Sequence, residues 1–462
     1  MMGFRAGYNT NGSSAHNNTF LGYSAGKGIT SGKLTGNRNI GIGRDAGLAL
    51  QSGAAENVLV GCFAGDAITG GTSNTIIGDN AGSGMTNAAG NVVVGHNALN
   101  DGAAGNNNVV IGNEAGFLAT SITQCTIIGA SAGSAAVMTG DNNTMVGRAS
   151  GNALTSGSEN TFIGAEAGDG TDDGASCVAV GFRALSANCG SNNVAVGGQA
   201  GQAVTGTENV FMGYTAGVSS TSCDRSVVIG NGAVSNAVMT GNRNTVIGAG
   251  AGNGLTSGVE NVMIGDLAGT RGTDVSTGGS NILLGHDTGT HDAGGTAQIV
   301  IGGDFQGTGD YQAHLGFGSN VAVLSIDGSD TSWSASSDER LKENVTTSTA
   351  GLSFLNDLRP VTFNWKKKKD VPSDMTTYYE EGSDDPCMGF GKTHHGFIAQ
   401  EVKTVLDNHT EVKNGQHIWQ QDADGTQRVA PSALVPMLVK ALQELSTKND
   451  ALEARIATLE AG

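Results

Sequence analysis

A glycine preceded by aliphatic residues recurs along most of this 462-residue chain, and its spacing constrains the fold more than any other feature. The spacing is mostly 17 residues, and Gly3 starts a partial copy ahead of the first full one. The seventeen glycines are at positions 22, 43, 61, 78, 95, 112, 129, 147, 164, 181, 197, 213, 230, 248, 265, 285 and 302. One repeat of this length is too short to bury its own apolar face, so neighbouring repeats must stack as the coils of a solenoid.

The composition excludes two other glycine-rich classes of protein. Collagen requires Gly at every third position and abundant Pro, whereas this chain has 75 Gly without that period and only 5 Pro. Disordered chains combine high charge with few β-branched residues. Here charged residues make up 14% of the chain, and the repeats are rich in Val, Ile and Thr. A regular repeat fold is the class that remains.

Each repeat carries the pattern Asn-(Thr/Val)-x-(Ile/Val)-Gly-x-x-Ala-Gly and a variable connector, as in residues 160–168. All 17 copies have Thr, Val or Ile three residues before the glycine, and Ile, Val, Leu or Met one residue before it. These two positions share one face of a strand, and their side chains suit a pleated, buried surface. The glycines permit the tight turn that ends the strand. We therefore expect a mostly β protein, a parallel β-roll or β-solenoid with one short strand per repeat.

Two further positions of the repeat predict how the coils are filled. Asn stands four residues before the glycine in 13 of the 17 copies, and stacked Asn side chains can form a hydrogen-bonded ladder. The position two before the glycine points to the opposite face of the strand and is also mostly apolar, as at Phe20, Leu59 and Phe162. Strands that are apolar on both faces are buried on both. We expect the positions three and one before the glycine to fill the coil and the position between them to contact partner chains. The alternative is a wide, two-layered core within one chain.

Composition and charge change near residue 320. Residues 1–320 contain 66 of the 75 Gly, whereas all five Pro and all three Trp follow. The formal net charge is −18, divided as −11 and −7 between these two parts. Nucleic acids and anionic membranes attract clustered positive charge, so we expect neither as a partner. The opening residues contain no apolar signal core, and no apolar run approaches the ~20 residues that cross a bilayer, so no membrane insertion is expected.

The cysteines predict free thiols in a protein made in a cytoplasm. The six of them, at positions 62, 125, 177, 189, 223 and 387, have neither CxxC spacing nor the density of a disulfide scaffold. His394-His395 has no Cys or carboxylate at ligand spacing, so we expect no metal and no cofactor. Asp169, Asp172 and Asp173 are candidate glycosidase carboxylates or calcium ligands, although the connectors of repeat rods are normally polar loops.

The last residues predict a coiled-coil helix over 433–460. Two sets of residues repeat every seven positions with an offset of three: Val435, Leu442, Asn449 and Ile456, and Leu438, Leu445, Leu452 and Leu459. This is an a/d heptad seam. Asn449 at an a position is a buried polar residue of the kind that fixes register and oligomer state. The alternative is an amphipathic helix that packs on its own domain.

A serine and a lysine five residues apart, Ser337 and Lys342, follow the change of composition near residue 320. Residues 337–342 have the sequence Ser-Asp-Glu-Arg-Leu-Lys. Serine becomes nucleophilic when a base takes its proton, and a lysine with a lowered pKa can be that base. Ser337 and Lys342 meet if the intervening chain turns. Taken by itself, the same segment is typical of a helix N-cap followed by a solvated helix.

Residues 3–310 resemble the β-roll heads of trimeric bacterial adhesins and the glycine-rich shafts of phage tail fibres. Three later blocks carry a second resemblance: Ser-Asp-x-Arg-x-Lys-Glu-Asn at 337–344, Pro-Val-x-Phe-x-Trp at 360–365 and Gly-Phe-Ile-Ala-Gln-Glu at 396–401. In this order they resemble the endosialidase-type C-terminal intramolecular chaperone, which is also a self-cleaving peptidase. The resemblance implies trimerisation of the fibre and then autocleavage of the Ser336–Ser337 bond. It also implies Ser337 as the nucleophile, Lys342 as the base and release of residues 337–462.

These observations predict three segments: a β-repeat shaft over 1–310, a connector strand and cleavage region over 311–336, and a small α+β chaperone domain over 337–462. The predicted function is a homotrimeric phage tail fibre that binds a host-surface glycan or protein. We expect it in the virion after synthesis in the host cytoplasm, joined by a separate attachment protein if the chain is complete. The alternatives are a tailspike polysaccharide depolymerase and a bacterial surface adhesin. A depolymerase requires a non-repeating catalytic insertion, and none is visible between residues 22 and 302.

Overall fold

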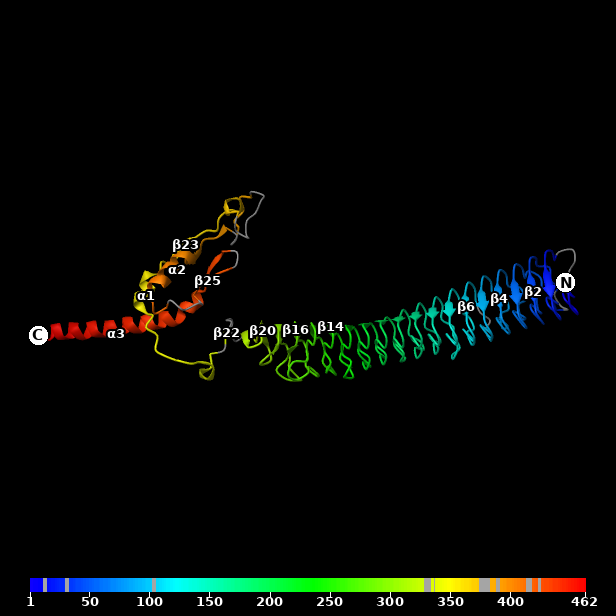
Figure 1. The fold of residues 1–462 in the computed structure, drawn as a ribbon, viewed down its shortest axis with the longest axis horizontal. Coiled ribbons are helices and arrows are strands. Elements are labelled where there is room, and N and C mark those ends of the chain that lie inside the picture. The colour runs from blue at the N-terminus through cyan, green and yellow to red at the C-terminus, as the bar shows by residue number, and fades with distance from the viewer. Residues whose placement is uncertain are drawn as a thin grey trace. The chain divides into compact units, whose positions relative to one another are not determined.

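The computed structural model describes residues 1–10, 15–29, 33–101, 105–327, 334–335, 337–373, 383–387, 391–412, 418–422 and 425–462. The chain divides into two compact units, Met1–Ser336 and Ser337–Gly462 (Figure 1). Each unit has a hydrophobic core of its own.

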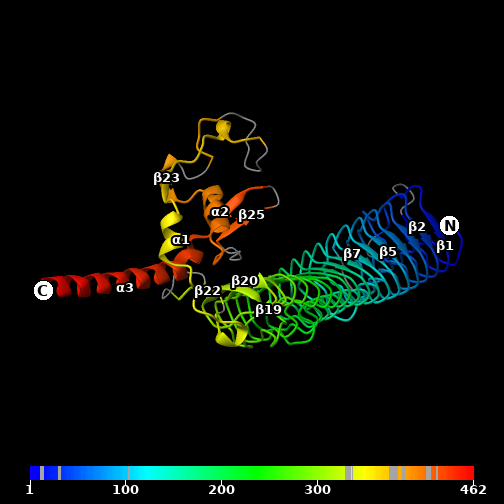
Figure 2. The same cartoon turned by 60° about the vertical axis from the view of Figure 1, so that its left-hand side comes forward.

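The first unit is a parallel β-solenoid with one three-residue strand in nearly every coil (Figure 2). Each strand pairs in parallel with the strand of the next coil; Thr161, for example, faces Thr144 on one side and Val178 on the other. The strands are β1 (Thr19–Leu21), β2 (Ile40–Ile42), β3 (Val58–Val60), β4 (Thr75–Ile77), β5 (Val92–Val94), β6 (Val109–Ile111), β7 (Thr126–Ile128), β8 (Thr144–Val146), β9 (Thr161–Ile163), β10 (Val178–Val180), β11 (Val194–Val196), β12 (Val210–Met212), β13 (Val227–Ile229), β14 (Thr245–Ile247), β15 (Val262–Ile264), β16 (Ile282–Leu284) and β18 (Ile299–Gly303). The predicted fold class and the period of about 17 residues are confirmed.

The middle residue of each strand points into the coil. Phe20, Leu59 and Phe162 are at most 1% exposed, whereas residues that flank them in the strands, such as Thr161 and Ile163, are half-buried or exposed. The prediction that the flanking positions fill the coil is therefore wrong. The middle position fits inside because the small residues after the turn lie against it, and a Cβ added to Gly168 would approach the Phe162 ring to 2.7 Å. The strands are nevertheless apolar on both faces, as expected.

A ladder of asparagines runs through the interior of the coils. The Oδ1 atom of Asn74 accepts hydrogen bonds from the backbone N–H and the Nδ2 of Asn91, at 3.0 and 3.1 Å. Asn74 in turn donates from Nδ2 to the Ala88 carbonyl at 2.8 Å, in the connector that leads to the next strand. Both asparagines are fully buried. The ladder therefore satisfies buried polar groups and ties each strand to the following connector.

The glycine that ends each strand has no room for a side chain. Gly164 has a φ of +136°, and a Cβ added to it would lie 2.5 Å from the carbonyl oxygen of Gly181 in the next coil. The recurrent glycine is thus required both by its backbone conformation and by the close approach of neighbouring coils.

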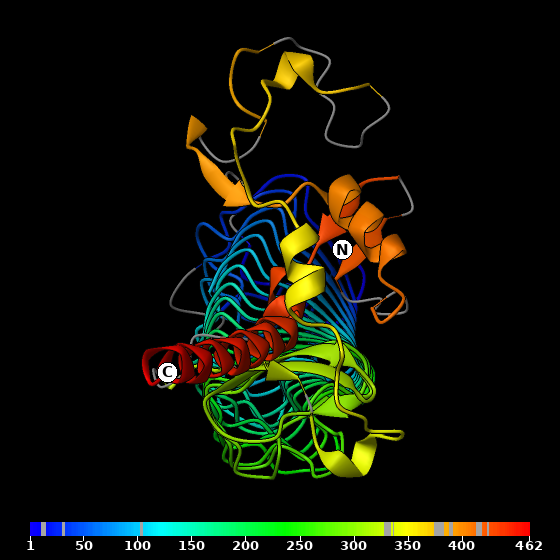
Figure 3. The same ribbon diagram turned by 90° about the vertical axis from the view of Figure 1, so that its left-hand side faces the viewer.

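The solenoid ends in an antiparallel hairpin. Strand β20 (Gln312–Phe317) adds in parallel to β18, and β21 (Asn320–Ser325) then pairs with β20 in antiparallel fashion. Strand β22 (Ser334–Ala335) pairs with β21, and the short strands β17 (Thr288–Gly289) and β19 (Phe305–Gln306) pair with each other. This change of direction is visible in the yellow-green part of the ribbon in Figure 3.

The second unit is a small α+β domain. Its helices are α1 (Leu352–Asp357), α2 (Ala399–Asn408) and α3 (Val435–Glu460), with 3₁₀ turns η1 (Glu339–Leu341), η2 (Lys368–Asp370) and η4 (Pro431–Leu434). Strands β23 (Val361–Phe363) and β24 (His394–Gly396) form one antiparallel pair, and β25 (Trp419–Gln421) and β26 (Gln427–Val429) form another. Phe354, Val402 and Leu434 contribute to its core. Helix α1 packs against α3, and α2 packs against the β25–β26 pair.

Candidate functional site

The predicted nucleophile and base are in contact at the beginning of the second unit. The Lys342 Nζ donates a hydrogen bond to the Ser337 Oγ at 2.7 Å. The contact forms because the chain turns between them: the Leu341 N–H donates to the Asp338 carbonyl at 3.1 Å, and the Lys342 N–H donates to the Glu339 carbonyl at 3.0 Å. The turn η1 therefore brings together two side chains that are five residues apart.

Asp338, rather than Ser337, caps this turn. Its Oδ1 accepts from the Arg340 backbone N–H at 2.9 Å, and its Oδ2 pairs with the Arg340 guanidinium at 2.6 Å. The bond from the Arg340 side chain, together with that from the backbone, lowers the pKa of Asp338. The expected helix is here a single 3₁₀ turn. Because Asp338 does the capping, the Ser337 hydroxyl is left to Lys342.

Ser337 and Lys342 are both exposed on the surface of the single chain. Two large apolar side chains of the same segment, Leu341 and Val345, are each 73% exposed. A lysine becomes a general base when it is removed from water. The geometry of a serine–lysine pair is therefore present, and the burial that activates such a pair has to come from other atoms. Ser336, the other residue of the predicted cleavage bond, lies outside the described residues.

The heptad seam of helix α3 is exposed within its own unit. Leu442 is 66% exposed and Leu459 is 73% exposed, and the other apolar a and d residues are exposed by 47% or more. The face that contacts α1 is a different one, because Ala441 is buried and the Glu444 carboxylate accepts from the Leu352 N–H at 2.9 Å. This arrangement argues against a helix whose seam packs on its own domain. The predicted register residue Asn449 is also exposed and donates to Glu453 at 2.9 Å.

Residues 337–411 match the family described as Chaperone of endosialidase. The match begins at Ser337, which is also the first residue of the second unit. It includes the Ser337–Lys342 pair, α1 and α2. No curated protein matches the chain. A chaperone-of-endosialidase domain after a β-solenoid body fits a protein of the tail-fibre or tailspike kind.

The adjacent histidines His394 and His395 lie in strand β24 of the chaperone-of-endosialidase domain. His394 stacks on Phe363 with ring centroids 5.7 Å apart and meets the edge of Trp365. His395 faces Thr362 across the β23–β24 pair. Among the residues that the structure describes, no three His, Cys, Asp or Glu side chains are grouped so as to hold a metal ion. Of the described helices, none is long and apolar enough to cross a membrane.

Two acidic side chains of the connector around residues 166–173 contact neighbouring coils. Burial raises the pKa of Asp169, and Glu166 adds to the shift. Glu166 is itself held in ion pairs by Arg148 and Arg183. Asp172 accepts a hydrogen bond from the Thr155 hydroxyl of the preceding coil. The contacts of Glu166 and Asp172 join neighbouring coils and so have a structural role, whereas one side-chain oxygen of Asp169 is buried without a hydrogen-bond partner.

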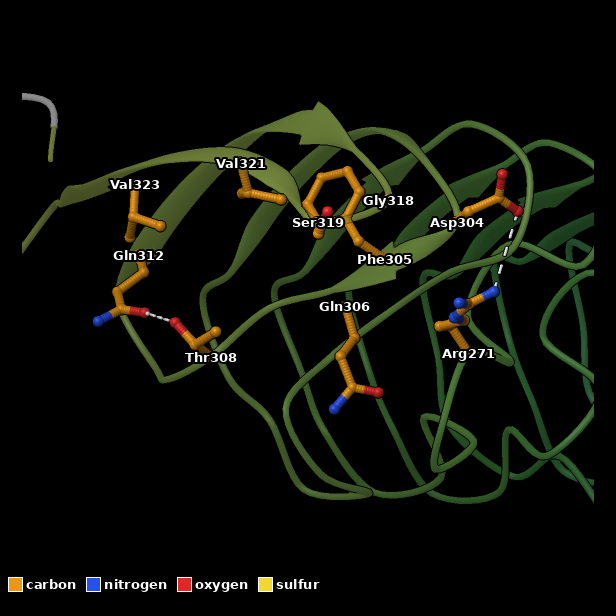
Figure 4. A pocket seen from close by; sticks show the side chains of 10 residues that line it. All are labelled: Arg271, Asp304, Phe305, Gln306, Thr308, Gln312, Gly318, Ser319, Val321 and Val323. Atoms are coloured by element: carbon orange, nitrogen blue, oxygen red, sulfur yellow. Dashed lines mark hydrogen bonds and ion pairs between the residues drawn. The ribbon is translucent and has the colours of Figure 1, made fainter. Parts of the chain in front are cut away.

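A pocket of about 830 Å³ lies at the end of the solenoid and was not indicated by the sequence (Figure 4). Arg271 faces Asp304 at 3.9 Å on one side, and the Thr308 hydroxyl donates to Gln312 at 2.9 Å on the other. The ring of Phe305 lines the space between them. The lining therefore combines an ion pair, amides and hydroxyls with an apolar wall. No local motif marks this pocket, because its residues meet only when the last coils and the β20–β21 hairpin stack.

Proposed function

We propose that this protein is a homotrimeric fibre whose C-terminal domain drives assembly and then releases itself by cleaving the Ser336–Ser337 bond. The observation that carries the proposal is the 2.7 Å contact between Lys342 Nζ and Ser337 Oγ at the first residue of the family match. We place the fibre in a phage virion, made in the host cytoplasm, where it binds a host-surface glycan or protein. The β-solenoid body and the chaperone-of-endosialidase domain support this proposal.

The proposed cleavage uses no group beyond the chain and water. Lys342 Nζ takes the proton of the Ser337 hydroxyl, and Oγ attacks the carbonyl carbon of Ser336. The peptide C–N bond breaks, the Ser337 nitrogen receives the proton, and an ester joins Ser336 to the Ser337 oxygen. Water then hydrolyses that ester. The products are a carboxylate at Ser336 and a fragment that begins with the free amine of Ser337.

Assembly should precede cleavage, because Lys342 is exposed in the single chain. Burial of the neighbouring Leu341 and Val345 side chains against other copies would withdraw Lys342 from water and allow it to act as a base. Cleavage would then depend on assembly without any additional signal.

The repeats give assembly a register problem that a terminal clamp solves. Seventeen similar coils allow three chains to slip by one coil with little loss of matching contacts. The exposed heptad seam of α3 supplies a coiled coil at one end of each chain. Once the chains are aligned and the clamp has left, the shaft is kinetically trapped, because nothing remains to guide refolding.

The test is the intact mass of the full chain under denaturing conditions. Wild type should give residues 1–336 and 337–462, whereas Ser337→Ala and Lys342→Met should stay at full length. Ser446→Ala is a matched control, because Ser446 is exposed on α3 away from the pair. Its cleavage should equal that of wild type. Uncleaved wild type in an assembled preparation, or continued cleavage of Ser337→Ala at this bond, contradicts the proposal.

A further inference from the structure

The outward side of the solenoid strands is an apolar face that the single chain leaves exposed. We define the outward face as the residues three and one before each recurrent glycine. These are 34 residues over the seventeen strands. Every one of them is Thr, Val, Ile, Leu or Met, and none carries a charge. None of them is buried: most are half-buried, and the exposed ones include Ile77 and Met212, each 40% exposed, and Ile163, which is 39% exposed. Parallel sheets are normally covered on both faces, so this face lacks a cover.

The outward face is larger than the apolar patches that monomers leave in water. Strands stack ~4.8 Å apart and three residues span about 10 Å, so seventeen strands present roughly 800 Å². Monomeric proteins rarely expose a contiguous apolar patch above about 600 Å². A stable interface between proteins buries about 800 Å² on each partner. The size of the face is therefore that of an interface.

Charged residues lie along the edges of the outward face. Just before the asparagine position, ion pairs join neighbouring coils, such as Arg225 with Glu208 at 3.0 Å and Arg243 with Glu260 at 3.0 Å. Just after the recurrent glycine, Arg183 pairs with Glu166 at 2.6 Å. An apolar strip between two polar margins is the pattern of a protein–protein interface with a dry centre and a wet rim.

We propose that the outward face is the surface along which three copies of this chain pack, parallel and in register, around an apolar axis. The inference rests on the trimer of the proposed function and identifies the residues that hold the shaft together. Another copy is the occupant because it has the same repeat along the same length, so contact can continue through all the coils. The copies run parallel because each has its C-terminal clamp at the same end.

Threonines on the outward face favour the in-register arrangement. Thr126, Thr144 and Thr161 occupy the same position in three successive strands, whereas Val occupies it in the next four. In register, the threonines of the three copies meet each other and their hydroxyls can exchange hydrogen bonds. A shift of one coil places a threonine hydroxyl against valine at one end of this run. The face also belongs entirely to residues 1–336, so it would hold the shaft after residues 337–462 depart.

The test is photo-cross-linking of the full chain with a benzophenone side chain at single positions. Ile163 and Met212 probe the outward face, and Leu445 probes the heptad seam of α3. Val238 is the control, because it is a connector residue that is 52% exposed and lies outside the outward face. Cross-linked dimers and trimers from Ile163 and Met212, with none from Val238, are expected.

The outcomes separate this inference from the proposed function. Cross-links from Leu445 but not from Ile163 or Met212 overturn the inference and leave the trimer standing. A monomer with no cross-links at any position overturns both. Cross-links from the outward face to a different protein also overturn the inference.

A second variant carries Val196→Lys, Met212→Lys and Ile229→Lys. After cleavage, the shaft of this variant should have the mass of a monomer, one third of the trimer mass, and its circular dichroism spectrum should be unchanged. Val238→Lys should keep the trimer mass.

Discussion

The side-chain oxygen of Asn57 accepts two hydrogen bonds from Asn74, one from the backbone N–H at 3.1 Å and one from Nδ2 at 3.0 Å. Both residues are completely buried. A buried amide without a partner is costly, whereas one that is fully bonded specifies its neighbours. The ladder therefore aligns each coil on the coil before it, in addition to the pairing of the strands.

Asn74→Ala should destabilise the shaft by about 2–3 kcal/mol, because the buried Asn91 N–H loses its acceptor and the Ala88 carbonyl loses its donor. Asn74→Ser should cost less. Ser226 occupies the same position of the ladder in another coil, where its Oγ accepts from the Asn244 N–H at 3.2 Å. The measurement is the midpoint of chemical denaturation for both variants. Equal losses for Ala and Ser would argue that the hydrogen bonds of the ladder contribute little.

Gly164→Ala should destabilise the shaft by about 3 kcal/mol or more, since the residue combines an unfavourable φ with contact against the next coil. The added Cβ would lie 2.5 Å from the Gly181 oxygen. Gly294→Ala is the matched control, because an added Cβ there meets nothing closer than 3.6 Å. The melting temperature should fall markedly for the first variant and remain near that of wild type for the second. Similar melting temperatures would mean that the coils can separate to admit a methyl group.

The period, the strands and the asparagine ladder could be predicted because each follows from a residue type repeated at one position. The sequence analysis did not predict which face of each strand points into the coil, because alternation shows which residues share a face but not which face is inside. In this repeat both faces carry residues that suit a buried strand surface: Thr161 and Ile163 on one face and Phe162 on the other. The deciding information is the complementarity of size between Phe162 and Gly168, or between Phe20 and Gly41 of the next coil. Such pairing of large and small residues is a signal that the sequence contained.

The spacing of Ser337 and Lys342 allowed a contact without requiring one, and the pairing itself was implied by the family resemblance. What decides it is the cap, since Asp338 binds Arg340 and so closes a single 3₁₀ turn. No sequence pattern predicted the pocket beside Arg271 and Gln312, because residues about 40 positions apart in sequence meet there through the stacking of coils. Contacts made by tertiary stacking have no local pattern.

The thiols should react in two classes. Cys62 and Cys387 are partly exposed, whereas Cys125, Cys177, Cys189 and Cys223 are buried. Burial also raises the pKa of Cys223 to about 12, which removes its reactive thiolate at neutral pH. An alkylating reagent at pH 8 should therefore modify two thiols quickly in the native protein and all six in denaturant, as counted by mass. Rapid labelling of Cys223 in the native protein would show that the coils open.

The chaperone-of-endosialidase domain should lose stability as the pH rises above neutrality. His409 joins α1 to the end of α2, with its Nε2 2.8 Å from Asp357 and its Nδ1 2.8 Å from Glu411. These bonds, that to Asp357 first, raise the pKa of His409 above its ordinary value of 6.5. A raised pKa in the folded state means that the contribution is complete below about pH 6.5 and is lost as the pH rises through the folded value.

His409→Gln should remove this dependence, since glutamine keeps a polar group but cannot become charged. Trp365 and Trp419 lie in this domain, and Trp333 is the only other Trp of the sequence, so tryptophan fluorescence reports mainly on the domain. The measurement is denaturant unfolding at pH 5.5, 6.5, 7.5 and 8.5. The denaturation midpoint of wild type should fall as the pH rises across this series. The midpoint of His409→Gln should be lower than that of wild type at the lower pH values and should change little with pH. His395→Gln, at an exposed histidine of β24, should follow wild type. If His409→Gln retains the wild-type slope, the pH dependence arises from other groups and the His409 contact contributes no charge to the fold.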